Sequence, residues 1–215
     1  MKSNRFPNHV GYVEGTVPDD IFDMIVSSAY EAKENDLKAV DTLVGNLEES
    51  YIMELPFYKH MEFEKYLLSI CREYENNFNL MTYYPILSGD RPLSLNLKML
   101  WANFQKKYEF NPVHHHTGLY SFVIWVKIPY DYRKEFEIDS CKNSKAKYPG
   151  TFAFYFSSSY GMVEEKTILL DPTFEKKIVL FPSNLSHCVY PFYTSDEYRI
   201  SISGNLYLSQ DQIQF

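Results

Sequence analysis

The chain has 215 residues, of which 45% are hydrophobic and 23% are charged. These are the proportions of a globular protein with a sizeable core, and they exclude a disordered chain. Only eight glycines are present, which excludes collagen-like and low-complexity proteins. The 21 basic and 28 acidic side chains give a net charge of −7. This charge disfavours nucleic acid as a partner, because neutralising phosphates requires surplus Lys and Arg.

The number of cysteines and the length of the apolar runs indicate in which compartment the protein is located. Cys71, Cys141 and Cys188 are odd in number and have no paired spacing, which argues against a disulfide framework and for a reducing compartment. No apolar run approaches the roughly 18 residues that a membrane span requires, and the first residues lack the apolar segment of a signal peptide. We expect a cytoplasmic protein without a membrane partner, and the oligomeric state stays open.

The first 90 residues have helical periodicity. Apolar side chains recur at three- and four-residue steps in a segment that starts at Asp19 or Asp20, in residues 36–51 and in residues 63–78. The third segment is the clearest, with one apolar stripe and charged side chains elsewhere around the helix. The sequence therefore predicts three helices whose apolar stripes face a core.

Strands are predicted after residue 90, in short runs rich in Val, Ile, Phe, Tyr and Trp. Seven runs are expected to be strands: 93–105, 119–128, 151–156, 165–170, 177–181, 187–191 and 198–208. Strands this dense, without intervening helices, favour a sandwich, jelly roll or barrel. Residues 130–149 are polar and predict a long loop of the kind that often serves function. We expect one structural domain, in which a helical part over 1–90 packs on a β core over 91–215.

Four of the six histidines lie in two places, His114, His115 and His116 in one and His187 in the other. Side chains two residues apart on an extended segment point the same way, so His114 and His116 should share a cavity that His115 faces away from. With His187 from a distant strand, they could occupy one face of a metal's coordination sphere and leave the other positions open. The alternative is a solvated cluster of histidines in a loop.

A scarce arginine follows on the next predicted strand. Arg199 is one of five arginines, and it shares a strand face with Ser201 while Ile200 and Ile202 share the other face. A cation on an inward face is costly to bury unless an anion pairs with it, and a guanidinium matches a carboxylate in shape. The pattern indicates a site for an acidic ligand. A surface ion pair with Glu197 is the alternative.

Two linked stretches carry a resemblance to a known family. They read NPVHHHTGLYSFVIWVKIP and FPSNLSHCVYPFYTSDEYRISISGN. They are similar to segments of the iron(II)/2-oxoglutarate-dependent oxygenase superfamily, and most of all to a small group of these oxygenases found in bacteria and their viruses. The resemblance covers about residues 95–208 and leaves the N-terminal part unmatched.

The resemblance implies a double-stranded β-helix, a jelly-roll barrel with helices buttressing one sheet. It implies that Fe(II), 2-oxoglutarate and O2 are used, and that 2-oxoglutarate is converted to succinate as a small-molecule or peptidyl substrate is oxidised, typically by hydroxylation. The site residues that it implies are His114, His116 and His187 for the metal, and Arg199, Ser201 and Asn103 for 2-oxoglutarate. Asn103 could equally cap a strand end.

The chain departs from the family at one position. The common ligand set is His-x-Asp/Glu with a distal His, whereas position 116 is His. An imidazole in place of a carboxylate removes one negative charge, and it leaves open whether His116, a water or another carboxylate completes the set. Two other functions stay open, a cupin-type metalloprotein without 2-oxoglutarate and a non-catalytic jelly-roll binding or structural module. The cupin pattern expects a Glu where Leu119 and Tyr120 stand.

Overall fold

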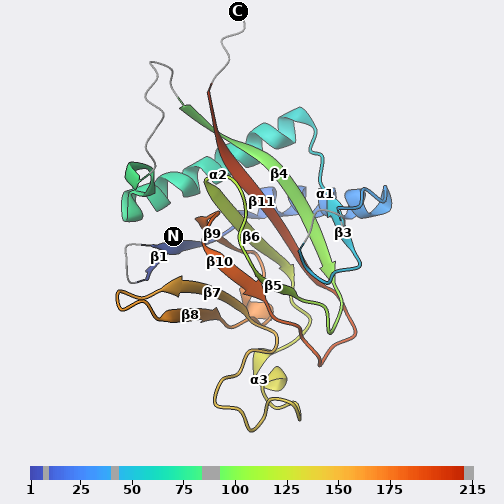
Figure 1. The fold of residues 1–215 in the computed structure, drawn as a ribbon. Coiled ribbons are helices and arrows are strands. Elements are labelled where there is room, and N and C mark those ends of the chain that lie inside the picture. The colour runs from blue at the N-terminus through green and yellow to red at the C-terminus, as the bar shows by residue number, and fades with distance from the viewer. Residues whose placement is uncertain (7–9, 40–43, 84–92, 211–215) are drawn as a thin grey trace, which may run out of the picture.

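The structure, a computed structural model, describes residues 1–6, 10–39, 44–83 and 93–210. Two antiparallel sheets lie face to face as layers, and helices cover the far side of the larger sheet (Figure 1). This is the double-stranded β-helix arrangement that the family resemblance implies. No helix in the described ranges is long and apolar enough to cross a membrane.

The larger sheet has seven strands, and every neighbouring pair in it is antiparallel. In spatial order they are β1 (Lys2–Arg5), β2 (Gly11–Thr16), β9 (Lys177–Pro182), β6 (Tyr120–Lys127), β11 (Arg199–Gln210), β4 (Leu93–Gln105) and β3 (Ser50–Ile52). The smaller sheet consists of β5 (Asn111–His114), β10 (Ser186–Val189), β7 (Phe152–Ser157) and β8 (Val163–Ile168). All seven predicted strands are confirmed, with ends shifted by up to two residues.

Two long helices pack on the larger sheet. They are α1 (Asp19–Glu34) and α2 (Phe57–Phe78), and the remaining helical segments are η3 (Leu80–Tyr83), α3 (Tyr132–Glu135) and η4 (Pro172–Phe174). Pro18 is the N-cap of α1, so Asp19 and Asp20 lie in its first turn, where their charge favours the helix dipole. The first and third predicted helices are thereby confirmed.

Two apolar cores result from this layering. One lies between the helices and the larger sheet, and Ile200 and Ile202 of β11 belong to it. The other lies between the two sheets and contains side chains of both, such as Trp125 and Phe152. Because side chains alternate along a strand, the other face of β11 points between the sheets, and Arg199 begins that row.

The helix predicted over residues 36–51 is wrong where the structure describes it. Residues 36–39 and 44–49 form turns and isolated bridges, and β3 begins at Ser50; residues 40–43 lie outside the described part. The first 90 residues also supply β1 and β2, which helical periodicity does not predict. These short segments become strands by pairing, β2 with β9 and β1 with β2. The expected boundary at residue 90 lies outside the described residues.

Candidate metal centre

Three histidines converge between the two sheets. His114 ends β5 and is paired in register with His187 of β10, which brings their rings to 4.3 Å between centroids. His116 follows β5, and its backbone N–H donates to the carbonyl of Ser183 at 2.8 Å. One ring nitrogen from each of the three histidines lies within 4.8 Å of the others, close enough to hold one metal ion.

Backbone carbonyls orient two of the rings. His114 Nδ1 lies 2.7 Å from the carbonyl oxygen of Pro112, and His187 Nδ1 lies 2.9 Å from that of Leu185. A carbonyl only accepts, so each Nδ1 carries the proton and each Nε2 keeps its lone pair for a metal. Such outer contacts fix the tautomer and direction of metal-binding histidines.

The surroundings also keep the rings neutral. Burial lowers the pKa of His114, and burial with the neighbouring His114 and His115 lowers the pKa of His116 to about 4. The pKa of His187 is well below its usual value, first because of burial between Phe152 and Phe181. Imidazole must be neutral to bind a metal, so all three groups are ready to do so at neutral pH.

The donor set suits iron but carries no charge. His115 is exposed and supplies no atom to the group, as the two-residue period predicts. Among the described residues, no Asp or Glu belongs to the group. Imidazole suits several transition metals, iron included, and three ligands on one side leave other positions open. Three neutral imidazoles leave the net charge of the site at +2 when a divalent ion is bound, whereas one carboxylate ligand would lower that net charge to +1.

A cavity of about 620 Å³ opens beside the histidines, between the two sheets. Its floor comes from β4, β6 and β11, which lie side by side across from β5 and β10 (Figure 1). All six predicted site residues line it. His115 lines it as well, so the prediction that His115 faces away from the cavity is wrong, although His115 supplies no atom to the group of metal ligands. Other lining residues include Gln105, Ser203, Asn205, Trp101 and Trp125.

Arg199 is buried in this cavity, with 2% of its surface exposed. Its Nε and Nη2 donate to Gln105 Oε1 at 3.2 and 2.7 Å, and Nη2 also donates to the carbonyl of Tyr190 at 2.9 Å. Nη1 donates to the hydroxyl of Tyr130 at 2.6 Å. Four of the five guanidinium N–H groups are therefore engaged, all by neutral acceptors.

No carboxylate pairs with this cation within the described residues. The alternative of an ion pair with Glu197 is wrong, because Glu197 pairs with the exposed Lys127 instead. Arg199 lies instead 5.3 Å from the ring centroid of Phe192 and 5.7 Å from that of Tyr130. A buried cation without an anion is costly, so the site favours a ligand that brings a negative charge.

Asn103 lies across from Ser201 in the β4–β11 register. Its Oδ1 accepts a hydrogen bond from Ser50 Oγ at 2.7 Å, and this bond leaves the Nδ2 donors for the cavity that Asn103 lines. The Asn103 amide, the Ser201 hydroxyl and the remaining Arg199 N–H thus form a group of donors. Asn103 lies within β4, so the alternative that it caps a strand end is wrong.

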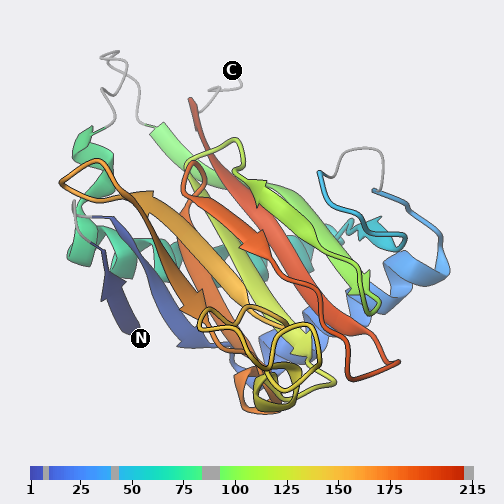
Figure 2. The same ribbon diagram turned by 60° about the horizontal axis from the view of Figure 1, so that its bottom comes forward.

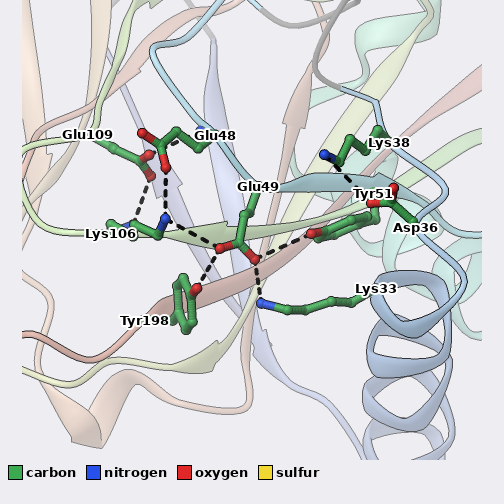
Figure 3. Close-up of polar contacts among 9 residues, drawn as sticks. All are labelled: Lys33, Asp36, Lys38, Glu48, Glu49, Tyr51, Lys106, Glu109 and Tyr198. Carbon is green, nitrogen blue, oxygen red and sulfur yellow. Dashed lines mark hydrogen bonds and ion pairs between the residues drawn. The ribbon is translucent and has the colours of Figure 1, made fainter.

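Glu49 holds β3, and with it Ser50, against the neighbouring elements (Figure 3). Its carboxylate accepts hydrogen bonds from Lys33 of α1 and from Tyr198, which precedes β11, and it forms a 3.5 Å ion pair with Lys106 beyond β4. Burial raises the pKa of Glu49, but the Lys33 and Tyr198 hydrogen bonds outweigh it and bring the pKa to about 2. These contacts of Glu49 hold the neighbouring Ser50 in place, and Ser50 in turn orients the Asn103 amide from outside the cavity.

Sequence reasoning missed two residues whose side chains accept hydrogen bonds from Arg199. Gln105 lies two residues beyond Asn103 on the same strand, so the two-residue period could have found it. Tyr130 comes from the predicted loop, which gathers at one end of the sheets around α3 (Figure 2), and no local pattern marks it. Five aromatic residues are candidates for lining the cavity by sequence, Tyr108, Phe110, Tyr120, Trp125 and Tyr190, and among them only Trp125 does.

Comparisons with known proteins show similarity in sequence to one family and similarity in fold to solved structures. The model of the family described as "Putative 2OG-Fe(II) oxygenase" matches residues 99–205, about half of the chain. A prolyl-4-hydroxylase from Pseudomonas putida has a similar structure, with a TM-score of 0.54, 12% identity and 94% of each chain covered. AviO1 from Streptomyces viridochromogenes Tue57 has a TM-score of 0.52 and 9% identity, covering 95% of this chain and 91% of its own. No curated protein matches the chain in sequence.

Proposed function

Since the chain belongs to the 2OG-Fe(II) oxygenase superfamily, which uses Fe(II), 2-oxoglutarate and O2, we propose that it is a hydroxylase. Its substrate is a small molecule or a peptidyl group. The prolyl-4-hydroxylase with a similar structure supports a hydroxylase, although the two chains share only 12% identity. The cytoplasm is the proposed location, and the three buried, unpaired cysteines are consistent with it.

One observation carries the proposal: three neutral imidazoles and a buried arginine without an acidic partner line the same cavity. His114, His116 and His187 would hold the iron through ring nitrogens. With no carboxylate ligand among the described residues, His116 takes the place that an Asp or Glu has in the common set. The proposal therefore includes an all-histidine metal site.

Arg199, Ser201 and Asn103 would hold the distal carboxylate of 2-oxoglutarate. Arg199 supplies the charge and one N–H, since its other four donors already have partners. The Asn103 amide and Ser201 hydroxyl add neutral donors at the same level of the sheet. Several donors converge on one anion here, which orients the cosubstrate toward the histidines.

Iron, 2-oxoglutarate and O2 would supply the oxidising chemistry, in which O2 is the oxidant: one of its oxygen atoms would end in succinate as CO2 is lost from 2-oxoglutarate, and the other would oxidise the substrate. The chain's own part is to bind, orient and exclude water. Trp101, which is 7% exposed, lies 5.5 Å from the His116 ring, and Trp125 is 2% exposed beside the same cavity. These apolar surfaces keep water from the metal side of the cavity.

The cupin alternative explains the histidines but gives no role to Arg199. A binding module explains neither the shared cavity nor the neutral, oriented imidazoles. An oxygenase accounts for the three histidines, which would bind iron, and for Arg199, which would bind 2-oxoglutarate.

Metal content tests the proposal directly. We expect His114→Ala, His116→Ala and His187→Ala to lose Fe(II) under anaerobic conditions, while His115→Ala keeps it as the matched control. Circular dichroism establishes that each variant is folded. Full iron content in the His116 variant would refute the three-histidine site, and a loss in the His115 variant equal to that in His187→Ala would refute the assignment of the strand face.

A further inference from the structure

Asn205 is a buried amide at the opposite end of the polar row from Arg199. It is 2% exposed, lines the cavity and pairs in register with Met99 of β4. It lies six positions beyond Arg199 on β11, which corresponds to about 20 Å along an antiparallel strand. A polar side chain so deeply buried needs a partner for its donors.

A chain of hydroxyl groups fixes which way this amide points. Ser121 Oγ lies 3.0 Å from Ser183 Oγ and 2.7 Å from Asn205 Oδ1. Ser121 has a single hydroxyl proton, and the shorter of its two contacts, the one to Asn205 Oδ1, takes it, so the Asn205 oxygen is the accepting end. With the amide reversed, its oxygen would lie against the sulfur of Met99, which has no proton to donate.

The nitrogen end of Asn205 therefore lacks a strong partner. Within the described residues, Nδ2 contacts only Met99 Sδ, at 4.0 Å. A thioether is a weak acceptor, and this one also lies 3.5 Å from the hydroxyl of Tyr207. Two N–H groups in a buried place thus face a cavity with almost nothing to accept them, which costs free energy unless a ligand supplies an oxygen.

The position relative to the histidines indicates which ligand this is. Trp101, whose ring contacts His116, pairs with Ser203, and Ser203 lies between Arg199 and Asn205 on β11. The metal centre is thus at the middle of the row. A cosubstrate that extends from the histidines to Arg199 leads away from Asn205, so the other end of the cavity is left for the substrate to be oxidised.

The side chains at this end select against charge. The charged residues of the described lining there are Glu54 and Lys98, and both are exposed at the mouth. The neighbouring surface is apolar and comes from Ile52, Met53 and Met99. A carboxylate or ammonium buried beside Asn205 would have no buried side chain of opposite charge next to it, whereas a neutral oxygen would satisfy the amide.

We infer that Asn205 is a substrate-binding residue, and that its Nδ2 donates a hydrogen bond to an uncharged carbonyl or hydroxyl oxygen of a partly apolar substrate. This inference rests on the proposed function, because the substrate must reach the metal. It assigns Asn103 and Asn205, two amides with hydroxyl-fixed orientation, to the two ends of one cavity.

Binding of small probes tests the inference without turnover. The protein is loaded anaerobically with Mn(II), in place of iron, and with 2-oxoglutarate. N-Methyl-2-pyrrolidone serves as the neutral acceptor, and cyclopentanecarboxylate and cyclopentylamine serve as charged probes of similar size. Paramagnetic relaxation of probe protons by Mn(II) gives both the affinity and the nearness to the metal. We expect N-methyl-2-pyrrolidone to bind near the metal and better than either charged probe.

Asn205→Leu should weaken N-methyl-2-pyrrolidone binding by about 3- to 10-fold, the loss of one neutral hydrogen bond. Asn103→Leu is the matched control, which should weaken 2-oxoglutarate and leave the probe unaffected. If Asn205→Leu does not fold, Asn205→Asp decides, because it keeps the acceptor for Ser121 and removes the amide donor.

The inference would be overturned if the Asn205 variant bound N-methyl-2-pyrrolidone as tightly as the parent does. It would also be overturned if a charged probe bound best, or if Mn(II) did not relax the protons of N-methyl-2-pyrrolidone in the parent. These failures leave Mn(II) and 2-oxoglutarate binding intact. A parent protein that binds neither Mn(II) nor 2-oxoglutarate would instead contradict the proposed function itself, and this inference with it.

Discussion

Replacing Arg199 by alanine removes the one buried cation in the described lining of the cavity. Four of its five N–H groups bond to Gln105, Tyr130 and Tyr190, so one remains for the distal carboxylate of 2-oxoglutarate. We therefore expect the arginine to contribute a single charge-assisted hydrogen bond and the attraction of its charge, rather than a bidentate pair.

A charge-assisted bond lost from a buried site costs about 2–3 kcal/mol, the lower part of the range for a buried charged pair. This corresponds to a Kd for 2-oxoglutarate raised about 30- to 150-fold. Pyruvate has the keto acid but not the distal carboxylate, so its affinity should change little. Arg199→Lys keeps the charge without the planar group and should fall between the parent and Arg199→Ala.

Anaerobic titration of the Fe(II)-loaded proteins with each keto acid, followed by charge-transfer absorbance, gives both affinities. Arg133→Ala is the matched control, since Arg133 is exposed and pairs with Asp131 and Asp171 outside the cavity. Equal 2-oxoglutarate affinity in the parent and in Arg199→Ala would refute the anchoring role. An equal loss for pyruvate would show a general disturbance of the cavity.

Two further predictions concern the support of the site. Glu49→Gln should lower the free energy of unfolding at pH 7 by about 1–2 kcal/mol, once screening by solvent is considered. The folded pKa of Glu49 is about 2, below the roughly 4.3 of an unfolded Glu. The stability difference between the parent and Glu49→Gln is therefore present above about pH 4.3 and fades as the pH falls toward 2. Urea denaturation at several pH values checks this, and a stability difference that persists at low pH contradicts it. In thermal unfolding, Gly150→Ala should destabilise the fold more than Gly161→Ala. Both glycines have positive φ, so the backbone strain is similar. An added Cβ at Gly150 would come within 2.7 Å of Tyr130, whereas an added Cβ at Gly161 would have no atom within 4 Å. Equal effects would show that only backbone strain matters.

Of the β core, the sequence by itself determined seven strands and the direction of their side chains, but it did not predict β5, the short strand that ends at His114. A period of two is a local property, so the order of the residues alone assigns Arg199 and Ser201 to one face and separates His115 from its neighbours. The residue types also limited the chemistry, since neutral imidazoles bind metals and a buried guanidinium needs an anion. The helix that begins at Asp19 and the helix that contains residues 63–78 followed from apolar stripes in the same way.

The sequence could not determine features that depend on distant neighbours. β1 and β2 are short and are strands because β9 provides a partner, so propensity alone does not predict them. Residues 36–39 and 44–49 have helical spacing, but pairing with β3 and with Phe110 takes precedence where the structure describes them.

The tertiary structure alone decided how the site is completed. No Asp or Glu of the described residues joins the three histidines, and this can be seen only when the strands are assembled. Tyr130 reaches Arg199 from 69 positions away, and Ser121 fixes the Asn205 amide from 84 positions away. A hydrogen bond depends on distance and direction between atoms, and sequence patterns carry neither for residues that only folding brings together.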